Sequence, residues 1–358
     1  MVDQRIVALA KILTDYSIKI KKGDTIEIDA GAEARDLILE LSKNILKKGA
    51  VPKVNLMLPG FSYVYYNHAT PEILKRFPKI RMFEAENVDG NISIGTEYNT
   101  KEMTTIDPQK IAMRQKVTHP ISEVYLKKDN WVLLEYPTNA LAQDAEMSLQ
   151  EFEDFVFEAC LQDWKSMEHE QDVLKGYLDR GSMVHLVAPD TDLKLNINGR
   201  QGVKCCGTRN MPDGEVMIAP VETDVNGYVR FTYPAVYNGK EVEDVYLEFK
   251  NGVVVKATAK KNEDFLQKMI AMDKGSKFLG EFSIAMNYGI KKFTKNILFD
   301  EKIGGSVHMA LGMAYKEGGG KNDSALHWDM IKDLRQGGSV LIDGKVIMKD
   351  GKFTIPLT

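Results

Sequence analysis

A change of pattern near residue 180 constrains the fold of this sequence most. Before that point, strand-like stretches alternate with helical ones, as in 24–31, 34–49 and 51–58. After it, strand-like stretches follow one another closely and are joined by Asn-Gly and Asp-Gly pairs. Such pairs favour tight turns because Asn, Asp and Gly tolerate positive φ. The sequence therefore predicts an α/β first half and an antiparallel, strand-rich α+β second half.

The first half has the pattern of βαβ units, which indicates a mostly parallel sheet. Gly49 is placed to end the helix that precedes the second strand. Ser148 and Glu151 form a capping-box pattern, so we expect a long helix to begin there and to continue, with a break, to about Arg180. The expected strands of this half are 24–31, 51–58, 91–98 and 130–137.

At 358 residues, the chain exceeds one average domain. We expect an N-terminal, mostly parallel α/β domain over 1–180 and a C-terminal, strand-rich domain over 181–358. A boundary near 120 fits almost as well.

Composition narrows the classes of partner. The formal net charge is −4 and no long basic run occurs, which argues against nucleic-acid binding. Three cysteines, two of them adjacent, make a poor disulfide framework and fit a reducing compartment. The N-terminal stretch lacks the apolar core of a signal peptide, and no apolar run is long enough to span a membrane. We therefore expect a cytoplasmic protein that does not bind membranes.

Residues 308–330 hold an unusual set of side chains that could bind a metal ion. If 306–315 is a helix, His308 and Tyr315 are seven steps apart and share one face, because seven steps of about 100° return to within about 20° of the start. If 325–330 is a strand, His327 and Asp329 also share a face. Imidazole and carboxylate groups suit zinc, cobalt or manganese. The alternative is that these histidines and Tyr315 are ordinary structural residues.

Two glutamates add to this set. Glu215 follows a Pro-Asp-Gly turn and Glu281 follows Gly280, and each stands directly before an apolar strand. An acidic residue at the start of a strand is usually solvated, so neither glutamate means much alone. Their shared Gly-Glu context makes them candidates for the same site.

Four motifs occur in one order: Pro-x-Gly-Glu-Val at 212–216, Leu-Gly-Glu at 279–281, His-x-Ala-Leu-Gly-x-Ala-Tyr at 308–315 and His-x-Asp at 327–329. This ordered set resembles the aminopeptidase T family of metallopeptidases, which includes aminopeptidase S and PepS. The first half matches more loosely, through 130–148. The chain looks shorter than typical members, with compact connections between Glu281 and His308.

The resemblance implies a metal-dependent aminopeptidase, which removes the N-terminal residue from peptides with a free N-terminus. It implies two α/β domains, and a homodimer that encloses the active sites. It also implies two divalent metal ions per chain, for which zinc, cobalt, manganese and magnesium are candidates. Tyr315 is then a further ligand or a catalytic hydroxyl, and Glu281 a catalytic residue as well as a ligand. The metal ligands implied by the motifs are Glu215, Glu281, His308, His327 and Asp329.

A mechanism follows as a hypothesis. Three carboxylates facing two divalent ions about 3.5–4 Å apart leave one positive charge, which a bridging hydroxide would neutralise. Asp329 or one of the two glutamates could span both ions. Such a hydroxide would attack a peptide carbonyl, and Tyr315 or a metal would stabilise the oxyanion.

Two other functions remain open from the sequence. One is a divalent-metal hydrolase that acts on another amide or on an ester, including a phosphoester. The other is a non-catalytic dimer that binds a small molecule through its α/β half. That half lacks the Gly-x-Gly-x-x-Gly fingerprint of dinucleotide binding after its first strand.

Overall fold

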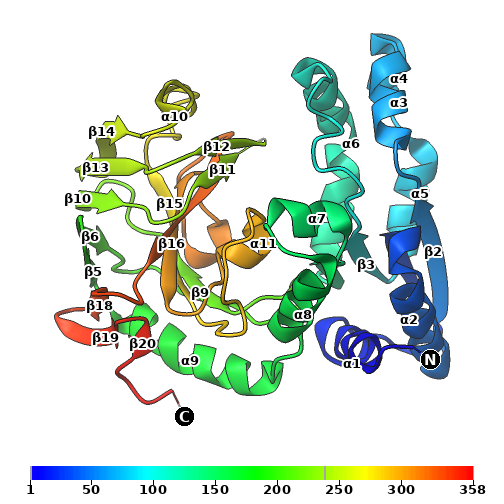
Figure 1. Ribbon diagram of the computed structural model, residues 1–358, viewed down its shortest axis with the longest axis horizontal. Coiled ribbons are helices and arrows are strands. Elements are labelled where there is room, and N and C mark those ends of the chain that lie inside the picture. Colours follow the sequence, from blue (N-terminus) through cyan, green and yellow to red (C-terminus); the bar gives the residue numbers. More distant parts are fainter. Residues whose placement is uncertain (1, 238, 358) are drawn as a thin grey trace. The chain divides into compact units, whose positions relative to one another are not determined.

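The structure is a computed structural model that describes residues 2–237 and 239–357 (Figure 1). Contacts within the chain divide it into two compact units. The first unit comprises Met1–Leu161 with Gly207–Pro212, and the second comprises Gln162–Cys206 with Asp213–Thr358.

The first unit contains a five-stranded parallel sheet with strand order β2-β1-β3-β4-β8. The predicted parallel α/β arrangement of this half is therefore confirmed. In β1, Ile26, Ile28 and Ala30 are buried on one face, while Glu27 and Asp29 alternate with them on the other. The strands are β1 (Thr25–Gly31), β2 (Val51–Met57), β3 (Gly90–Gly95), β4 (Trp131–Glu135) and β8 (Asn210–Met211).

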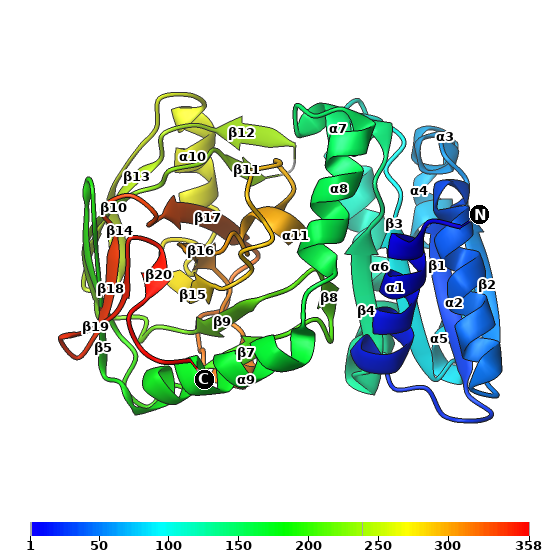
Figure 2. The same ribbon diagram turned by 60° about the horizontal axis from the view of Figure 1, so that its bottom comes forward.

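Helices cover this sheet on both sides (Figure 2). The expected capping box is present, with Ser148 and Glu151 bonded to each other at the start of α8. Gly49 has a φ of 76° just past α2, which is the conformation that a helix-ending glycine adopts. The helices are α1 (Gln4–Ile12), α2 (Arg35–Lys47), α3 (Phe61–His68), α4 (Pro71–Lys75), α5 (Lys79–Asn87), α6 (Pro108–Lys128), α7 (Asn139–Asp144) and α8 (Leu149–Cys160).

The second unit begins with α9 (Trp164–Arg180), which follows α8 after the expected break. An eight-stranded antiparallel sheet follows, in the order β14-β13-β10-β6-β5-β18-β19-β20. The three expected turns join its hairpins at 251–252, 343–344 and 350–351, with positive φ at all six residues. The strands are β5 (Met183–Ala188), β6 (Thr191–Asn196), β10 (Val225–Arg230), β13 (Tyr246–Lys250), β14 (Val253–Thr258), β18 (Ser339–Ile342), β19 (Lys345–Lys349) and β20 (Lys352–Phe353).

A second antiparallel sheet of five strands has the order β17-β16-β15-β9-β7. Apolar side chains from both sheets form one buried cluster, which is the core of this unit. The strands are β7 (Val203–Cys205), β9 (Glu215–Ile218), β15 (Leu279–Ala285), β16 (Ser306–Gly312) and β17 (His327–Asp333). Smaller elements complete the unit: β11 (Ala235–Tyr237), β12 (Lys240–Val242), α10 (Glu263–Ile270) and α11 (Ile297–Asp300).

The helix expected over 306–315 is wrong, because this segment forms strand β16. Val307, Met309 and Leu311 point into the apolar core, and the residues between them point to the opposite face. Pairing with β15 on one side and β17 on the other outweighs the helix preference of the Ala, Leu and Met residues. The strand expected around 325–330 is confirmed as β17.

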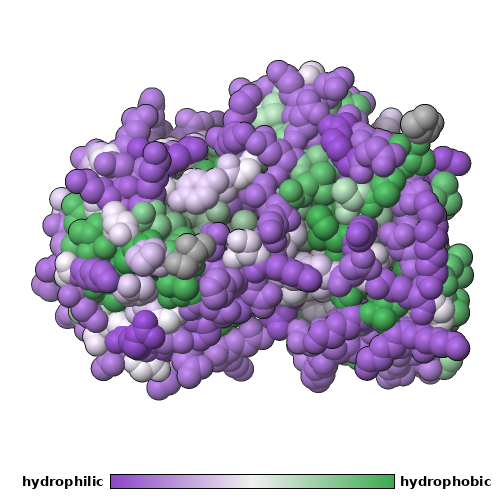
Figure 3. Space-filling view, turned by 90° about the horizontal axis from the view of Figure 1, so that it is seen from below, coloured by the Kyte–Doolittle hydropathy of each residue, from purple (hydrophilic) through white to green (hydrophobic). Residues whose placement is uncertain are grey.

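Hydrophilic residues cover most of the face shown in Figure 3. None of the helices in the described part of the chain has both the length and the apolarity that a bilayer crossing requires.

Candidate metal centre

Four neighbouring strands bring the five predicted ligands to one face of the five-stranded sheet. Glu215 in β9 pairs with Ala285, and His308 in β16 pairs with Ser283 of β15. Across the other edge of β16, Asp329 pairs with Ala310. Paired residues point to the same face and every second residue of a strand repeats it. The residues on this face are Glu215, Glu281, His308, His327 and Asp329.

The positions of β15 and β16 beside the ligands on this face hold small residues, which leaves room above these two strands for the larger ligand side chains. These positions are Ser283, Ala285, Ala310 and Gly312. The opposite face of the same strands is apolar and belongs to the core, with Phe282, Ile284, Met309, Leu311 and Trp328. The alternation of β15 and β16 thus separates a packing face from a ligand face.

Glycines before the two glutamates are explained by close backbone approach. A Cβ on Gly280 would lie 2.3 Å from the carbonyl oxygen of Met313, and one on Gly214 would lie 2.9 Å from the side chain of Asn287. Gly214 also has a φ of 120°, which side chains rarely permit. The Gly-Glu pairs noted in the sequence are therefore required by packing at both places.

Glu281 lies between the two histidines and presents one carboxylate oxygen to each. Its Oε1 is 3.1 Å from Nε2 of His308, and its Oε2 is 3.5 Å from Nε2 of His327. Asp329 Oδ1 is 3.5 Å from the same atom of His327 and 3.9 Å from that of His308. Three sets of three potential ligand atoms result here, each within 4.8 Å. Glu215–Glu281–His308 and Glu281–His327–Asp329 share Glu281, and the third set is Glu301–His308–Asp329.

Backbone carbonyls orient both imidazoles. Nδ1 of His308 lies 2.9 Å from the carbonyl oxygen of Glu301, and Nδ1 of His327 lies 2.9 Å from that of Met313. Since a carbonyl only accepts, each Nδ1 donates. In the neutral ring Nε2 then carries the lone pair, and in both histidines it faces Glu281 and Asp329, whereas Nδ1 of His308 lies 3.4 Å from Oε2 of Glu215. This is the arrangement that metal-binding histidines adopt.

The electrostatics of the cluster show a need for positive charge. Burial raises the pKa of Glu215 to about 8. Although burial alone would have the opposite effects, Asp329 raises the pKa of His327 to about 10, and His327 lowers that of Asp329 to about 2. Oδ1 of Asp329 is buried and has no hydrogen bond among the described residues. The donor set and this unsatisfied oxygen therefore fit divalent cations.

Tyr315 lies at the edge of this cluster. It follows β16 in an extended conformation, so the helical reason given for its position is wrong, yet its ring contacts that of His327 edge to face at 5.2 Å. Burial, followed by the charge of Glu281, raises the pKa of Tyr315. Its side chain nevertheless remains 42% exposed and lines a small cavity together with Glu281. The hydroxyl thus keeps its proton, and it belongs to a residue that contacts the cluster through its ring and is partly exposed to solvent.

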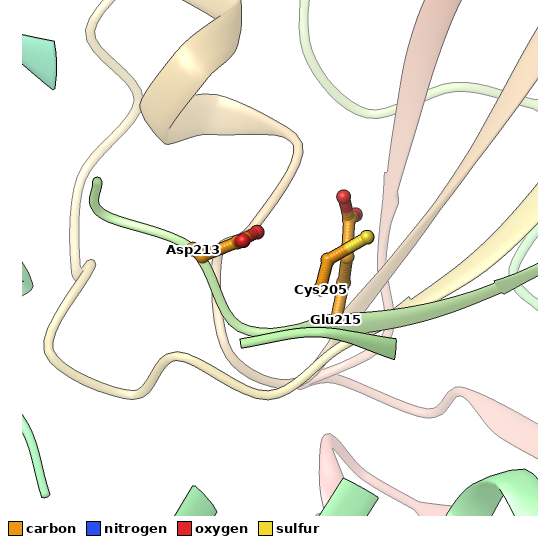
Figure 4. A group of neighbouring side chains, drawn as sticks. All are labelled: Cys205, Asp213 and Glu215. Carbon is orange, nitrogen blue, oxygen red and sulfur yellow. The ribbon is translucent and has the colours of Figure 1, made fainter. Parts of the chain in front are cut away.

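Sequence reasoning missed several residues next to these ligands. Lys302 is fully buried, forms an ion pair with Glu301 and has its Nζ 4.0 Å from Oε1 of Glu215. Cys205 and Asp213 also approach Glu215 (Figure 4). The Pro-Asp-Gly turn was a signal for Asp213, whereas Cys205 stood out only as one of two adjacent cysteines. No local pattern marks Lys302.

The chain is similar to several aminopeptidases, to two of them along almost its whole length. Aminopeptidase 2 of Geobacillus stearothermophilus is 28% identical over 398 residues, covering 96% of this chain and 94% of that protein. Aminopeptidase AmpS of Bacillus subtilis is 26% identical, and the alignment covers 96% of this chain and 96% of that protein. Aminopeptidase T of Thermus thermophilus is 25% identical over 71% of this chain and 72% of its own length.

Two solved structures share the fold. Wild-type AmpT from Thermus thermophilus superposes with a TM-score of 0.86 at 22% identity, over 98% of this chain and 99% of the other. A 2,5-dihydroxypyridine dioxygenase from Pseudomonas putida has a TM-score of 0.62 at 10% identity, over 99% of both chains. The second match shows that the fold alone does not decide the reaction.

The model of the thermophilic metalloproteases (M29) matches residues 2–353, and the chain belongs to this family.

Proposed function

We propose that this protein is a metal-dependent aminopeptidase that hydrolyses the first peptide bond of its substrates at a dinuclear metal centre. The observation that carries the proposal is the pair of ligand sets that share Glu281 on one face of a buried sheet. Membership of a metalloprotease family and similarity to proteins named aminopeptidase support the reaction class.

In this proposal Glu215, Glu281 and His308 would hold one ion, and Glu281, His327 and Asp329 would hold the other. Glu281 would contribute to both sets, because one of its oxygens faces His308 and the other faces His327. Mixed carboxylate and imidazole shells accept zinc, cobalt, manganese or magnesium, so availability would decide which metal is used. When bound, such ions supply Lewis acidity and lower the pKa of water from 15.7 towards about 7.

The protein's own side chains supply the remaining chemistry. Tyr315 keeps its proton because its pKa is raised, so its hydroxyl can donate a hydrogen bond to the oxygen that becomes negative during attack on the peptide carbonyl. Glu281 lines the same small cavity, so a lone pair that a cation does not use can accept a hydrogen bond from the attacking water and orient it. The carbonyls of Glu301 and Met313 keep both histidines in one orientation throughout.

An acidic centre also favours a substrate with a free amino terminus. Three carboxylates converge on one face of the sheet, and the α-ammonium or amine of a peptide can pair with such groups or bind a cation beside them. The scissile bond then lies next to the first residue. A homodimer remains a proposal that rests on the family resemblance, and light scattering of the purified protein would test it. A cytoplasmic location remains a proposal that rests on cysteine usage.

Chelation tests the proposal directly. Purified protein should hydrolyse an aminoacyl-anilide, thorough treatment with EDTA should abolish this activity, and added zinc or cobalt should restore it. An N-acetylated version of the same anilide and a phosphomonoester are the matched substrates, and neither should be hydrolysed. Activity that survives complete metal removal, or a preference for the phosphoester, would refute the aminopeptidase assignment.

A further inference from the structure

A lysine is enclosed beside the candidate metal centre. Lys302 follows α11, has no exposed surface and forms an ion pair with Glu301. Its Nζ lies 4.0 Å from Oε1 of Glu215, one of the proposed metal ligands. Burying an ammonium group costs several kcal/mol unless carboxylates compensate it, so its place among acidic groups requires an explanation.

Glu215 belongs to a second set of potential ligands besides the one it forms with Glu281 and His308. A ligand atom of Glu215 lies within 4.8 Å of one from Cys205 and one from Asp213. Figure 4 shows the thiol of Cys205 beside the carboxylate of Glu215, with the carboxylate of Asp213 directed towards both. Thiolate and carboxylate groups at this spacing are the donors of a cation site.

Lys302 places a positive charge beside this second set. Its Nζ lies 4.0 Å from Oε1 of Glu215, the residue that the two sets share, and it also forms an ion pair with Glu301. An ammonium group in this position supplies the positive charge that a cation bound by Cys205, Asp213 and Glu215 would otherwise bring.

We infer that Lys302 is a built-in cation that takes the place of a third metal ion beside Glu215, so that the centre accepts two divalent ions rather than three. The inference rests on the proposed metal centre. Its position also makes Lys302 a positioning residue, because the adjacent carbonyl of Glu301 holds His308 while the ammonium faces Glu215. One dipeptide thus supports two ligands.

Cobalt binding tests this inference, because cobalt ions bound by thiolate show a charge-transfer absorption in the near ultraviolet. Metal-free wild-type protein titrated with cobalt should bind about two ions per chain without this absorption. Lys302→Ala removes the ammonium and vacates its space, so it should bind one ion more and acquire the absorption. Adding Cys205→Ser to this variant should remove the absorption. Lys302→Met is the matched control, because it removes the charge but fills the space, and it should bind no third ion.

Each of the following results would overturn either the inference or the proposed metal centre. A thiolate absorption in the wild-type protein that Cys205→Ser abolishes would overturn the inference, since a metal would then coexist with the lysine. Equal cobalt content in Lys302→Ala and wild type would also overturn it. So would a Lys302→Ala chain that stays unfolded with cobalt present, because a metal ion should replace the lost charge. Failure of the wild-type protein to bind any cobalt would instead refute the proposed metal centre itself.

Discussion

Each unit of the molecule buries a group of carboxylates, and the two groups are opposites. In the first unit, Glu27 accepts hydrogen bonds from Lys53 at 2.7 Å, Asn55 at 2.8 Å and Tyr125 at 2.5 Å. Asn91 donates to the neighbouring Asp29 at 2.9 Å. Although burial alone would raise it, these donors lower the pKa of Glu27.

In the second unit, the carboxylates face one another and the two histidines, and Glu215 also accepts a hydrogen bond from Ser283 at 3.0 Å and has Lys302 4.0 Å away. Burial raises the pKa of Glu215 to about 8, and Oδ1 of Asp329 lacks a hydrogen bond among the described residues. The comparison teaches that burial of acidic groups does not by itself identify a metal site. A buried carboxylate that the chain supplies with donors is structural, whereas a group of carboxylates short of donors requires cations from outside.

The sharpest test of this comparison is the same substitution in each group. Glu281→Gln should lower kcat/KM on an aminoacyl-anilide by at least about a thousandfold, because Lewis-acid stabilisation amounts to several kcal/mol and each 1.4 kcal/mol is about tenfold. Metal content measured by elemental analysis should also fall. Glu27→Gln is the control, and its activity per folded molecule should match the wild type. Near-wild-type rates in Glu281→Gln would show that the second group is not the catalytic centre.

A smaller loss is expected at the edge of the cluster. Tyr315→Phe removes one hydroxyl and should reduce kcat by about 10²–10³-fold, the usual effect of losing one donor to a developing oxyanion. Metal content should not change if Tyr315 is a donor rather than a ligand. Tyr288→Phe is the matched control, because the hydroxyl of Tyr288 donates to the backbone carbonyl of Gly351. Equal kinetics for both variants would remove Tyr315 from the mechanism.

These two groups also show how far the sequence could predict the structure. The parallel strands of the first unit and the hairpins of the second follow from local periodicity and from turn residues such as Asn251 and Gly252. The prediction of a helix over 306–315 was wrong because Ala, Leu and Met occur in strands as well as in helices. Only the pairing of this segment with β15 and β17, which are separated from it in the sequence, decides between the two.

The site was predictable only where its residues are close together in the sequence or belong to a motif. His327 and Asp329 are two apart in one strand, so a local rule placed them on one face. Glu215 and Glu281 were predicted as ligands from the order of the four motifs, because no local rule predicts that β9 and β15 are neighbours. Lys302 was not predictable, because a lysine between Glu301 and Ile303 has the appearance of any solvated residue. Its burial depends on packing from several distant segments.

A smaller effect is expected on the free energy of unfolding when the carboxylate group of the first unit is changed. Glu27→Gln leaves the ammonium of Lys53 without its buried partner and should reduce the free energy of unfolding by about 2 kcal/mol, less than for a fully enclosed pair because Lys53 is 28% exposed. Glu84→Gln is the control, since Glu84 pairs with the same lysine at 3.3 Å but is 34% exposed, and it should cost at most about 1 kcal/mol. Urea denaturation measures both. Equal effects would mean that the buried network adds nothing beyond a surface ion pair.

The smallest expected effect is a difference in pH dependence. In the metal-free protein, Glu215 has a pKa raised from 4.5 to about 8 and His327 one raised from 6.5 to about 10. Between pH 7 and 8 the folded state therefore binds more protons than the unfolded state, so its stability falls as pH rises, by roughly 1 kcal/mol for each proton involved. Glu27 acts in the opposite direction, because its lowered pKa gives stability above pH 4.5 that is lost as pH falls.

Bound metal should remove this dependence, since cations displace the protons from both ligands. Thermal unfolding of metal-free and metal-loaded protein from pH 6.5 to 8 measures the difference, and calorimetry in buffers of different ionisation enthalpy measures the protons released. The metal-free protein should become less stable with rising pH, and metal binding should release protons. A metal-free protein whose stability rises over this interval would mean that the second group is satisfied by the chain alone, as the first group is.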